Sequence, residues 1–239
     1  MTGSLLGLPP ARTAPDEGLI AHLRTLVAAE DPPSPELPRT TVDGLVTALL
    51  AVEDDARSRY RALGLSDETA AATLADVGRK VAAYGADVDG PWLVGLLRAD
   101  VVAAGRLQVT RVPHADGASL HVPEGGPLTP EVVDSALRQV RSLLGPVPLH
   151  CTSWLLDPTL DALPPTSNIR RFAARFDVTP TQPGAEGVHD VCRFVFRRPV
   201  RDVLDPDLVT PRTSLERLVA AHLRAGGSWS VPHGDLRDD

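Results

Sequence analysis

Lysine is almost missing from this chain, although the chain is not short of positive charge. Of its 24 lysine and arginine side chains only Lys80 is a lysine, Met1 is the only methionine, Asn168 is the only asparagine, and isoleucine occurs only at Ile20 and Ile169. These residues need AT-rich codons, so their shortage is what a very GC-rich coding sequence produces. The abundance of arginine therefore does not by itself indicate phosphate or nucleic-acid binding.

Long apolar runs are also missing. None approaches the roughly 18 to 20 residues that cross a bilayer, and the start, MTGSLLGLPPARTAPDEG, lacks a basic region followed by an apolar stretch. We therefore expect a cytoplasmic protein with no membrane partner. The net charge of −7 offers no basic excess for a nucleic acid, so no nucleic-acid partner is expected either.

Cysteine is scarce, and the common hydrolase and metal motifs are missing. Cys151 and Cys192 form neither a disulfide framework nor a CxxC pair, and both lie in apolar runs that favour strands. We expect buried, unreactive thiols, with a reactive Cys151 as the alternative. The chain has no GxSxG, HExxH or Walker sequence and no local zinc-ligand spacing of histidines, so we expect no metal.

The first hundred residues carry the periodicity of helices. Residues 1–17, with three prolines, are expected to be a flexible arm, and residues 18–105 a helical domain. The expected helices cover 18–29, 42–63, 66–84 and 91–101, separated by prolines or glycines. Ser66 is a predicted N-cap, because two acidic residues follow it in the first turn.

From residue 106 the pattern changes to short alternating runs separated by turns, which is typical of an α/β (α+β) fold. The predicted strands are 106–112, 118–123, 148–156, 176–180, 191–196 and 229–232, and the predicted helices are 130–144, 167–176 and 214–225. Strands 176–180 and 191–196 are expected to form an antiparallel ribbon. Thr129 and Pro130 open the first helix, and Thr213 with Glu216 forms a capping box before the last.

A strand, a glycine-containing loop and a helix follow one another between residues 119 and 144. Gly125 and Gly126 precede the N-terminus of the helix, where backbone amides and the helix dipole favour a phosphate. The pattern indicates a pyrophosphate-binding loop. The alternative is a tight turn whose glycines adopt a positive φ.

Three blocks of this sequence carry a resemblance to known proteins: LHVPEGGPLTPEVVDSALRQV, CTSWLLDPTL with LPPTSNIRRF, and PRTSLERLVAAHLRAGGSW. Together they resemble an actinobacterial family of acyltransferase-domain proteins. The family combines a helical N-acyltransferase N-terminal domain with a GNAT-like, mixed-sheet C-terminal domain, here 106–239. The resemblance implies acyl-CoA as co-substrate and transfer of the acyl group to an amine of a small molecule. A catalytically inactive ligand-binding or protein-interaction module is the alternative.

The resemblance also assigns a site for acyl-CoA between two parallel strands that diverge. Strand 118–123 would contact the thioester, and strand 148–156 would diverge from it. The implied CoA-binding residues are Val122, Gly125, Gly126, Leu128 and Thr129. The usual spaced glycines of the pyrophosphate loop are reduced to two here. The family's catalytic tyrosine has no counterpart either, because both tyrosines of this chain fall in the N-terminal helices.

Three residues are candidates for the catalytic chemistry. His121 is a candidate base because a neutral imidazole can deprotonate an ammonium group near pH 7, and Glu124 is the other candidate. Ser153 is the candidate donor to the leaving thiol or, alternatively, a partner of the substrate amide. It is preferred to His150, since alternation along a strand places these two side chains on opposite faces.

Three further residues are candidates for contacts with the acceptor. Asp157 is either an anchor for the substrate amine or a turn and cap residue, because Pro158 follows it. Asn168 and Arg171 lie three residues apart on a short helix, so both can reach one ligand.

Overall fold

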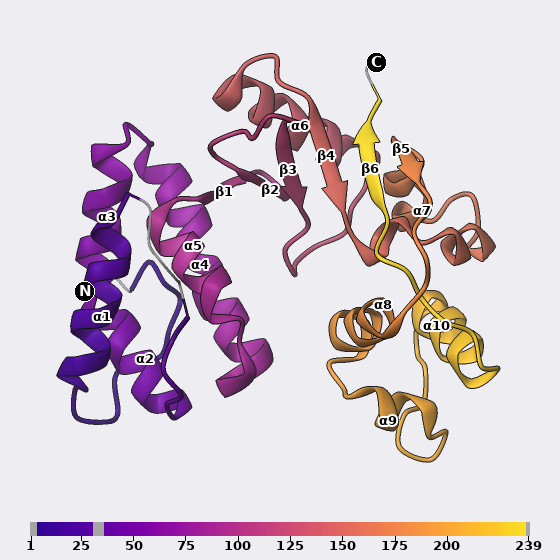
Figure 1. Ribbon diagram of the computed structural model, residues 1–239, viewed down its shortest axis with the longest axis horizontal. Helices are drawn as coiled ribbons and strands as arrows, with labels where there is room; N and C mark the ends of the chain where they lie inside the picture. Colours follow the sequence, from indigo (N-terminus) through magenta and orange to yellow (C-terminus); the bar gives the residue numbers. More distant parts are fainter. Residues whose placement is uncertain (1–3, 31–35, 238–239) are drawn as a thin grey trace. The chain divides into compact units, whose positions relative to one another are not determined.

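The structure is a computed structural model that describes residues 4–30 and 36–237. It divides into two compact units (Figure 1). The first comprises Met1–Val112 with Val122–Gly125, and the second comprises Pro113–His121 with Gly126–Asp239. The predicted boundary after residue 105 therefore lies within the first unit, between two strands that pair with each other.

Helices build most of the first unit, as the periodicity predicts. They are α1 (Glu17–Ala28), α2 (Val42–Ala51), α3 (Glu53–Ala62), α4 (Asp67–Tyr84) and α5 (Gly90–Arg98), with a short 3-10 turn, η1 (Gly85–Asp87), after α4. The predicted cap of α4 is confirmed, since the Ser66 side chain accepts a hydrogen bond from the amide of Thr69. The single helix expected over 42–63 is wrong, because the backbone leaves the helical region at Val52.

The segment before α1 differs from the flexible arm expected over 1–17. Leu6 is completely buried, and its carbonyl accepts a hydrogen bond of 2.8 Å from the amide of Gly78 on α4. A Cβ at Gly78 would lie 2.4 Å from that carbonyl oxygen, so the close approach requires glycine. The hydroxyl of Ser4 donates to Glu53 on α3. These contacts attach residues 4–8 to the helices.

An antiparallel hairpin completes the first unit. Strand β1 (Val101–Ala104) pairs with β2 (Leu107–Thr110), and Gly105 in the turn has a φ of 59°. The helix expected over 91–101 ends earlier than predicted, at Arg98, because Ala99 adopts a left-handed conformation. Val101 is therefore a strand residue. The hairpin packs on α4, which brings the start of the segment after β2 close to that helix.

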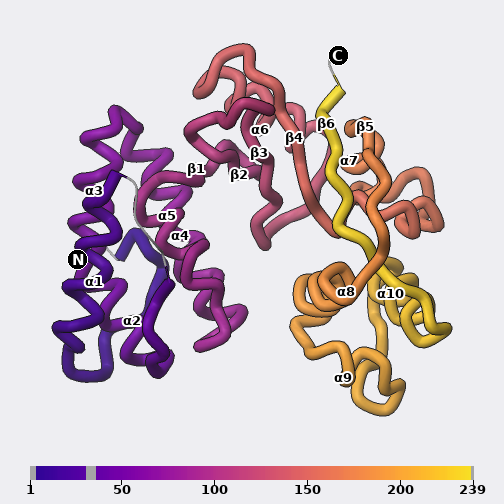
Figure 2. The backbone as a smooth tube through the Cα atoms, in the orientation of Figure 1, coloured from indigo at the N-terminus to yellow at the C-terminus, as the bar shows by residue number. Residues whose placement is uncertain are grey.

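The second unit contains strands in the order β3-β4-β6-β5. Strand β3 (Ala118–His121) is parallel to β4 (Leu149–Thr152), and β6 (His233–Leu236) is antiparallel to both β4 and β5 (Phe176–Thr179). Figure 2 shows the C-terminal segment running between β4 and β5. Helix α6 (Pro130–Leu144) connects β3 to β4, and it starts after Thr129 with Pro130 at its first position, as predicted.

Helices and short turns connect β4 to β5 and β5 to β6 along the chain. They are η2 (Trp154–Leu156), η3 (Pro158–Ala162), α7 (Asn168–Ala173), α8 (Ala185–Val191), a π-helical turn η4 (Cys192–Phe196), α9 (Val200–Leu204) and α10 (Ser214–Arg224). The capping box of α10 is confirmed, with Thr213 accepting from the Glu216 amide and the Glu216 carboxylate accepting from the Thr213 amide. In the described part of the chain, no helix is both long and apolar enough to cross a membrane.

Two predicted strands are wrong. Residues 191–196 are helical, because Gly187, Val191 and Cys192 recur at helical spacing on a buried face and the partner of β5 is β6. The strand expected over 229–232 starts later, at His233. Trp229 is instead fully buried in the core formed with α8, η4 and α10, where its indole N–H donates to the carbonyl of Trp154.

Candidate functional site

The parallel strands β3 and β4 pair over only half of their length. Their register comprises Ala118↔Leu149 and Ser119↔His150, and both strands continue two residues further, to His121 and Thr152. The ends of β3 and β4 are thus not paired with each other. Such a divergence leaves backbone polar groups at the strand ends for another partner. It is the geometry that the resemblance implies for a thioester site.

His121 lies on the less buried face of β3. Along this strand Ala118 and Leu120 are buried, while Ser119 and His121 are partly exposed. Because His150 pairs with Ser119, its side chain belongs to the same face. The structure thus groups His121 with His150 rather than with Ser153. Ser153 follows the strand and caps η2, where its Oγ accepts a hydrogen bond of 3.1 Å from the amide of Leu155.

His150 is a polar residue that the sequence analysis set aside. Within the described residues neither of its buried ring nitrogens forms a hydrogen bond, and Asp116 Oδ1 lies 4.0 Å from Nε2. Its ring centroid lies 5.0 Å from that of His233, whose Nδ1 lies 3.0 Å from Thr152 Oγ1. A buried imidazole without a partner costs free energy, which marks this face as a candidate site. The alternation of polar residues in both strands was the available signal.

Asp157 serves as a cap in the structure. It is 3% exposed, and its Oδ1 accepts from the amide of Thr159 at the start of η3. Its Oδ2 accepts from both the amide and the hydroxyl of Ser230, at 2.7 and 2.5 Å. These contacts join η3 to the segment before β6, and they match the capping alternative.

Asn168 and Arg171 both lie on α7, as predicted. Asn168 is the first residue of the helix and is half-buried, whereas Arg171 is exposed. Arg171 lines a cavity together with residues of α6 and of the C-terminal end of β6. The other face of α7 holds Phe172, whose ring lies 5.2 Å from that of Phe176.

The loop before α6 has two glycines that are not required by the backbone. Neither Gly125 nor Gly126 has a positive φ, so the tight-turn alternative is wrong. A Cβ at Gly126 would meet no atom within 4 Å, and both glycines are exposed. Of the other predicted CoA contacts, Leu128 is buried and Thr129 makes no side-chain hydrogen bond to the helix amides. Val122 is half-buried.

Glu124 is held by two side chains of α4, all within the first unit. Lys80 Nζ lies 2.7 Å from Glu124 Oε2, and the Tyr84 hydroxyl donates to Glu124 Oε1. The side chains of Lys80 and Glu124 are 12% and 17% exposed. Lys80 Nζ also lies 5.8 Å from the ring centroids of both Tyr84 and Trp92, within the range of cation–π contacts. The carboxylate is therefore part of a compact, largely buried cluster.

The environment of Glu124 favours its ionised form. Burial alone would raise the pKa of Glu124, but the hydrogen bonds from Lys80 and Tyr84 and the charge of Lys80 together lower it. A carboxylate with a lowered pKa is a weak proton acceptor near pH 7. The cluster thus favours a positioning role for Glu124 over the role of a base.

Arg106 holds the same segment from the β1–β2 turn. Its Nη1 donates a hydrogen bond of 2.7 Å to the carbonyl of Pro123, next to Glu124. Burial and the neighbouring charge of Arg79 lower the pKa of Arg106. Arg79 in turn pairs at 2.9 Å with Asp76, a fully buried carboxylate. Residues 122–125 are thus attached to the first unit through side chain and backbone.

Sequence reasoning missed Lys80 and placed Tyr84 away from any site. The two lie four residues apart on α4, and Glu124 follows Tyr84 by forty residues. The available signal for Lys80 was that it is the single lysine in a chain whose other basic side chains are all arginine.

Both thiols are buried. Cys151 and Cys192 are free, and burial raises their pKa to about 12 and about 11, which disfavours the reactive thiolate. The prediction of buried cysteines is confirmed, although Cys192 lies in a helical turn rather than in a strand. Among the described residues, no group of three or more histidine, cysteine or acidic side chains is arranged to hold a metal ion.

Comparison with known families and structures adds to this geometry. The family described as the GNAT-like C-terminal domain matches residues 71–236, and the N-acyltransferase N-terminal domain matches residues 11–93. A comparison with curated proteins finds no match.

Solved acyltransferase structures match nearly the whole chain. One, in complex with CoA and 10C-teicoplanin, is 28% identical with a TM-score of 0.83, over 98% of this chain and 85% of that one. A second, with decanoyl-CoA and teicoplanin, is 28% identical with a TM-score of 0.75, over 97% and 91%. A third, with decanoyl-CoA, is 27% identical with a TM-score of 0.79, over 97% and 85%.

Proposed function

Because the chain belongs to the family of the GNAT-like C-terminal domain, we propose that it transfers an acyl group from acyl-CoA to an amine of a small molecule. The early end of pairing between β3 and β4 carries this proposal, since it leaves the ends of two parallel strands open to a thioester. The similar acyltransferases that hold CoA or decanoyl-CoA support acyl-CoA as co-substrate. Those that also hold teicoplanin or 10C-teicoplanin support a small molecule as acceptor.

The loop between β3 and α6 supplies the phosphate site in this proposal. Gly125 and Gly126 need no positive φ, and a Cβ at Gly126 would meet no protein atom, so their small size is left to serve a ligand. The positive end of the α6 dipole favours the pyrophosphate there. Thr129 lies at the same end of α6, where its hydroxyl is hydrogen-bonded to the Glu131 carboxylate rather than to the helix amides.

The reaction needs one proton acceptor and one proton donor. The amine nitrogen attacks the thioester carbonyl, the new C–N bond forms, and the C–S bond breaks to release CoA. We assign to His121 the proton that leaves the nitrogen, because it lies at the end of β3 on the less buried face. Ser153 is the proposed donor to the leaving sulfur although it does not share the strand face of His121. It follows the diverging end of β4, and its Oγ accepts from Leu155, which leaves its own hydrogen to donate.

Glu124 acts in this proposal as a positioning residue. Its ion pair with Lys80 and its hydrogen bond from Tyr84 fix residues 122–125, the segment that immediately follows β3. Because Gly125 follows Glu124 directly, these contacts also restrain the backbone position of the two loop glycines. Such restraint matters because a displacement of about 1 Å at a reacting centre can cost roughly 100-fold in rate.

Titration calorimetry with acetyl-CoA, octanoyl-CoA and decanoyl-CoA tests the proposal. The folded full chain is expected to bind at least one of them with a 1:1 stoichiometry. Absence of measurable binding of all three acyl-CoAs to the folded chain would contradict the proposal. Binding without any acyl transfer to amines would instead support the alternative of an inactive ligand-binding module.

A further inference from the structure

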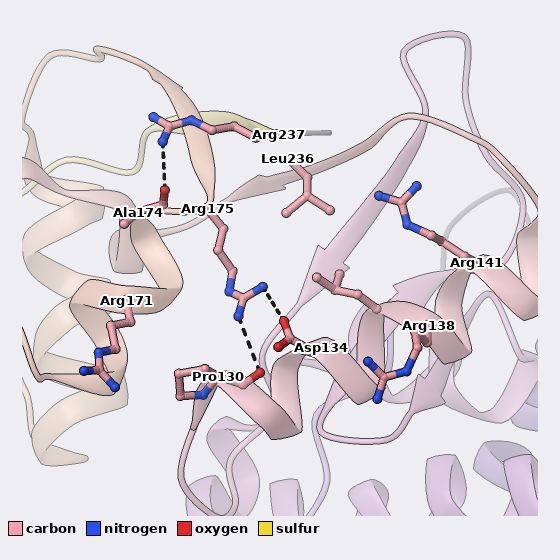
Figure 3. A pocket seen from close by; sticks show the side chains of 10 residues that line it. Pro130, Asp134, Arg138, Arg141, Arg171, Ala174, Arg175, Leu236 and Arg237 are labelled. Atoms are coloured by element: carbon pink, nitrogen blue, oxygen red, sulfur yellow. Dashed lines mark hydrogen bonds and ion pairs between the residues drawn. The ribbon is translucent and has the colours of Figure 1, made fainter. Parts of the chain in front are cut away.

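A basic cavity lies between α6, α7 and the end of β6, all within the second unit (Figure 3). Its volume is about 780 Å³, which falls within the roughly 300–1,000 Å³ of small-molecule sites. Its lining includes five arginines: Arg138, Arg141, Arg171, Arg175 and Arg237. Among the described lining residues, Asp134 is the only acidic one. The cavity therefore carries a strong excess of positive charge in a chain whose net charge is negative.

Four of the arginines come as two pairs of like charge. Arg138 and Arg141 lie three residues apart on α6, whereas Arg171 lies on α7 and Arg175 follows that helix, which ends at Ala173. Like charges three residues apart on a helix repel each other, so Arg138 and Arg141 destabilise α6 unless an anion is present. Nothing in the packing of α6 requires them, because Arg138 and Arg141 are both exposed.

Only part of this charge is neutralised by the protein. Arg175 pairs with Asp134 at 2.6 Å, and Arg237, just after β6, pairs with Asp177 at 2.7 Å. Figure 3 shows the side chain of Arg175, which follows α7, reaching Asp134 on α6. In residues 4–30 and 36–237, no carboxylate forms an ion pair with Arg138 or Arg141. These two guanidinium groups are therefore ready to bind an anionic ligand.

The cavity also has an apolar part. Leu137 of α6, Ala174 after α7 and Leu236 of β6 also line it. Figure 3 shows Ala174 and Leu236 among the arginines. Arginine binds phosphate through paired hydrogen bonds and stacks on aromatic faces. An apolar floor with a guanidinium rim thus fits a ligand that combines an aromatic base with phosphates, which is the chemistry of a nucleotide.

The cavity begins where the phosphate-binding loop ends. Pro130 lines the cavity and is the first residue of α6, directly after Thr129. Arg138 lies eight residues further along the same helix, about 12 Å at 1.5 Å per residue. A ligand whose pyrophosphate sits on the loop can therefore continue along α6 into the cavity.

We propose that this cavity binds the nucleotide end of acyl-CoA and that Arg138 and Arg141 receive its 3′-phosphate. The inference rests on the proposed function, and it adds the side chains that would distinguish CoA from its dephosphorylated form. The 3′-phosphate is the one phosphate of CoA outside the pyrophosphate. It therefore gives an experiment that tests the cavity separately from the loop.

Calorimetric titration of the full chain with CoA and with 3′-dephospho-CoA tests the inference. Loss of charge-assisted hydrogen bonds to one phosphate predicts at least about tenfold weaker binding of 3′-dephospho-CoA. In the double variant Arg138→Gln/Arg141→Gln, the two ligands are expected to bind within about twofold of each other. The affinity of that variant for 3′-dephospho-CoA is expected to match that of the unmodified chain.

Arg201→Gln is the matched control, because Arg201 lies on α9 with 87% of its side chain exposed and does not line the cavity. It is expected to keep the full preference for CoA. Equal binding of the two ligands by the unmodified chain, or a preference that survives in the double variant, would overturn the inference alone. If the folded chain binds neither ligand, the proposed function fails as well. Thermal melting confirms that each variant is folded.

Discussion

Lys80 Nζ lies 2.7 Å from Oε2 of Glu124, so the single lysine of the chain forms a largely buried ion pair with the segment that follows β3. Tyr84, one turn later on α4, donates to the other oxygen of the same carboxylate. A helix of the first unit thereby fixes the start of the loop to which we assign the pyrophosphate. The stability of this cluster and the activity of the protein are therefore expected to depend on the same three side chains.

Replacing Lys80 by methionine is expected to destabilise the protein. The change leaves the Glu124 carboxylate buried without its cation, which costs about 3 kcal/mol in unfolding free energy. Urea unfolding measures this loss. The double variant Lys80→Met/Glu124→Gln is the control, since it removes both charges and is expected to be more stable than Lys80→Met alone. If the loss of unfolding free energy in the double variant equals the sum of the losses in Lys80→Met and in Glu124→Gln, the two side chains do not interact directly.

The acid side of the stability profile is expected to depend on Glu124. Its pKa is lowered in the folded state, so its contribution is present above the unfolded carboxyl pKa of about 4.3 and is lost as the pH falls through the folded value. Unfolding free energy measured from pH 6 to pH 3 is expected to fall less steeply in Glu124→Gln. A profile parallel to that of the unmodified chain would show that Glu124 titrates normally.

Tyr84→Phe is expected to affect activity, whereas Tyr60→Phe is expected to affect stability alone. Both changes remove a hydroxyl that donates one hydrogen bond, to Glu124 and to the buried carbonyl of Leu96 respectively. Each is expected to cost about 1 kcal/mol in unfolding free energy. Only Tyr84→Phe loosens the segment after β3, so only it is expected to lower kcat/KM. Equal rates in the two variants would remove Tyr84 from the account.

His121→Gln is expected to lower kcat by about 100-fold or more, because general base catalysis contributes roughly 10²–10⁴-fold. Binding of acyl-CoA is expected to change little. His189→Gln, at an exposed position of α8, is the matched control and is expected to keep full activity. If His121→Gln retains its rate while His150→Gln loses it, the base is the buried imidazole of β4 instead.

Gly126→Ala separates ligand binding from folding. The added methyl meets no protein atom and the backbone has no positive φ, so the unfolding free energy is expected to stay the same or rise slightly. The affinity for acyl-CoA is expected to fall about tenfold, since the methyl lies where the pyrophosphate approaches the backbone. Gly184→Ala, at another open, extended position, is the control and is expected to change neither quantity. Unchanged affinity in Gly126→Ala would remove the loop from the proposed site.

Local signals in the sequence predicted the local structure well. The caps at Ser66 and Thr213 were predicted correctly because a cap depends on residues within one turn. The strand predicted over 191–196 was wrong. A short apolar run fits a buried strand and a buried helix equally, and the choice depends on a distant partner. The strand that pairs with β5 comes from the C-terminal end of the chain instead.

The site was predictable only where its residues follow one another in sequence. His121 and the glycine loop lie within ten residues, whereas the contact of Tyr84 with Glu124 spans forty and depends on how the segment after β3 returns to α4. The arginines show the same limit. Their number reflects the composition of the chain and indicates no site. Only the fold shows that Arg138 and Arg141 line the same cavity as an arginine of α7.

Release of free CoA thiol from decanoyl-CoA, measured with and without a panel of small-molecule amines, tests the central claim most directly. We expect release that depends on the amine, with the acyl group recovered on the amine nitrogen by mass spectrometry, and we expect it to fall about 100-fold in His121→Gln. Decanoyl-CoA that binds to the folded chain but yields no acylated amine with any member of the panel would contradict the account.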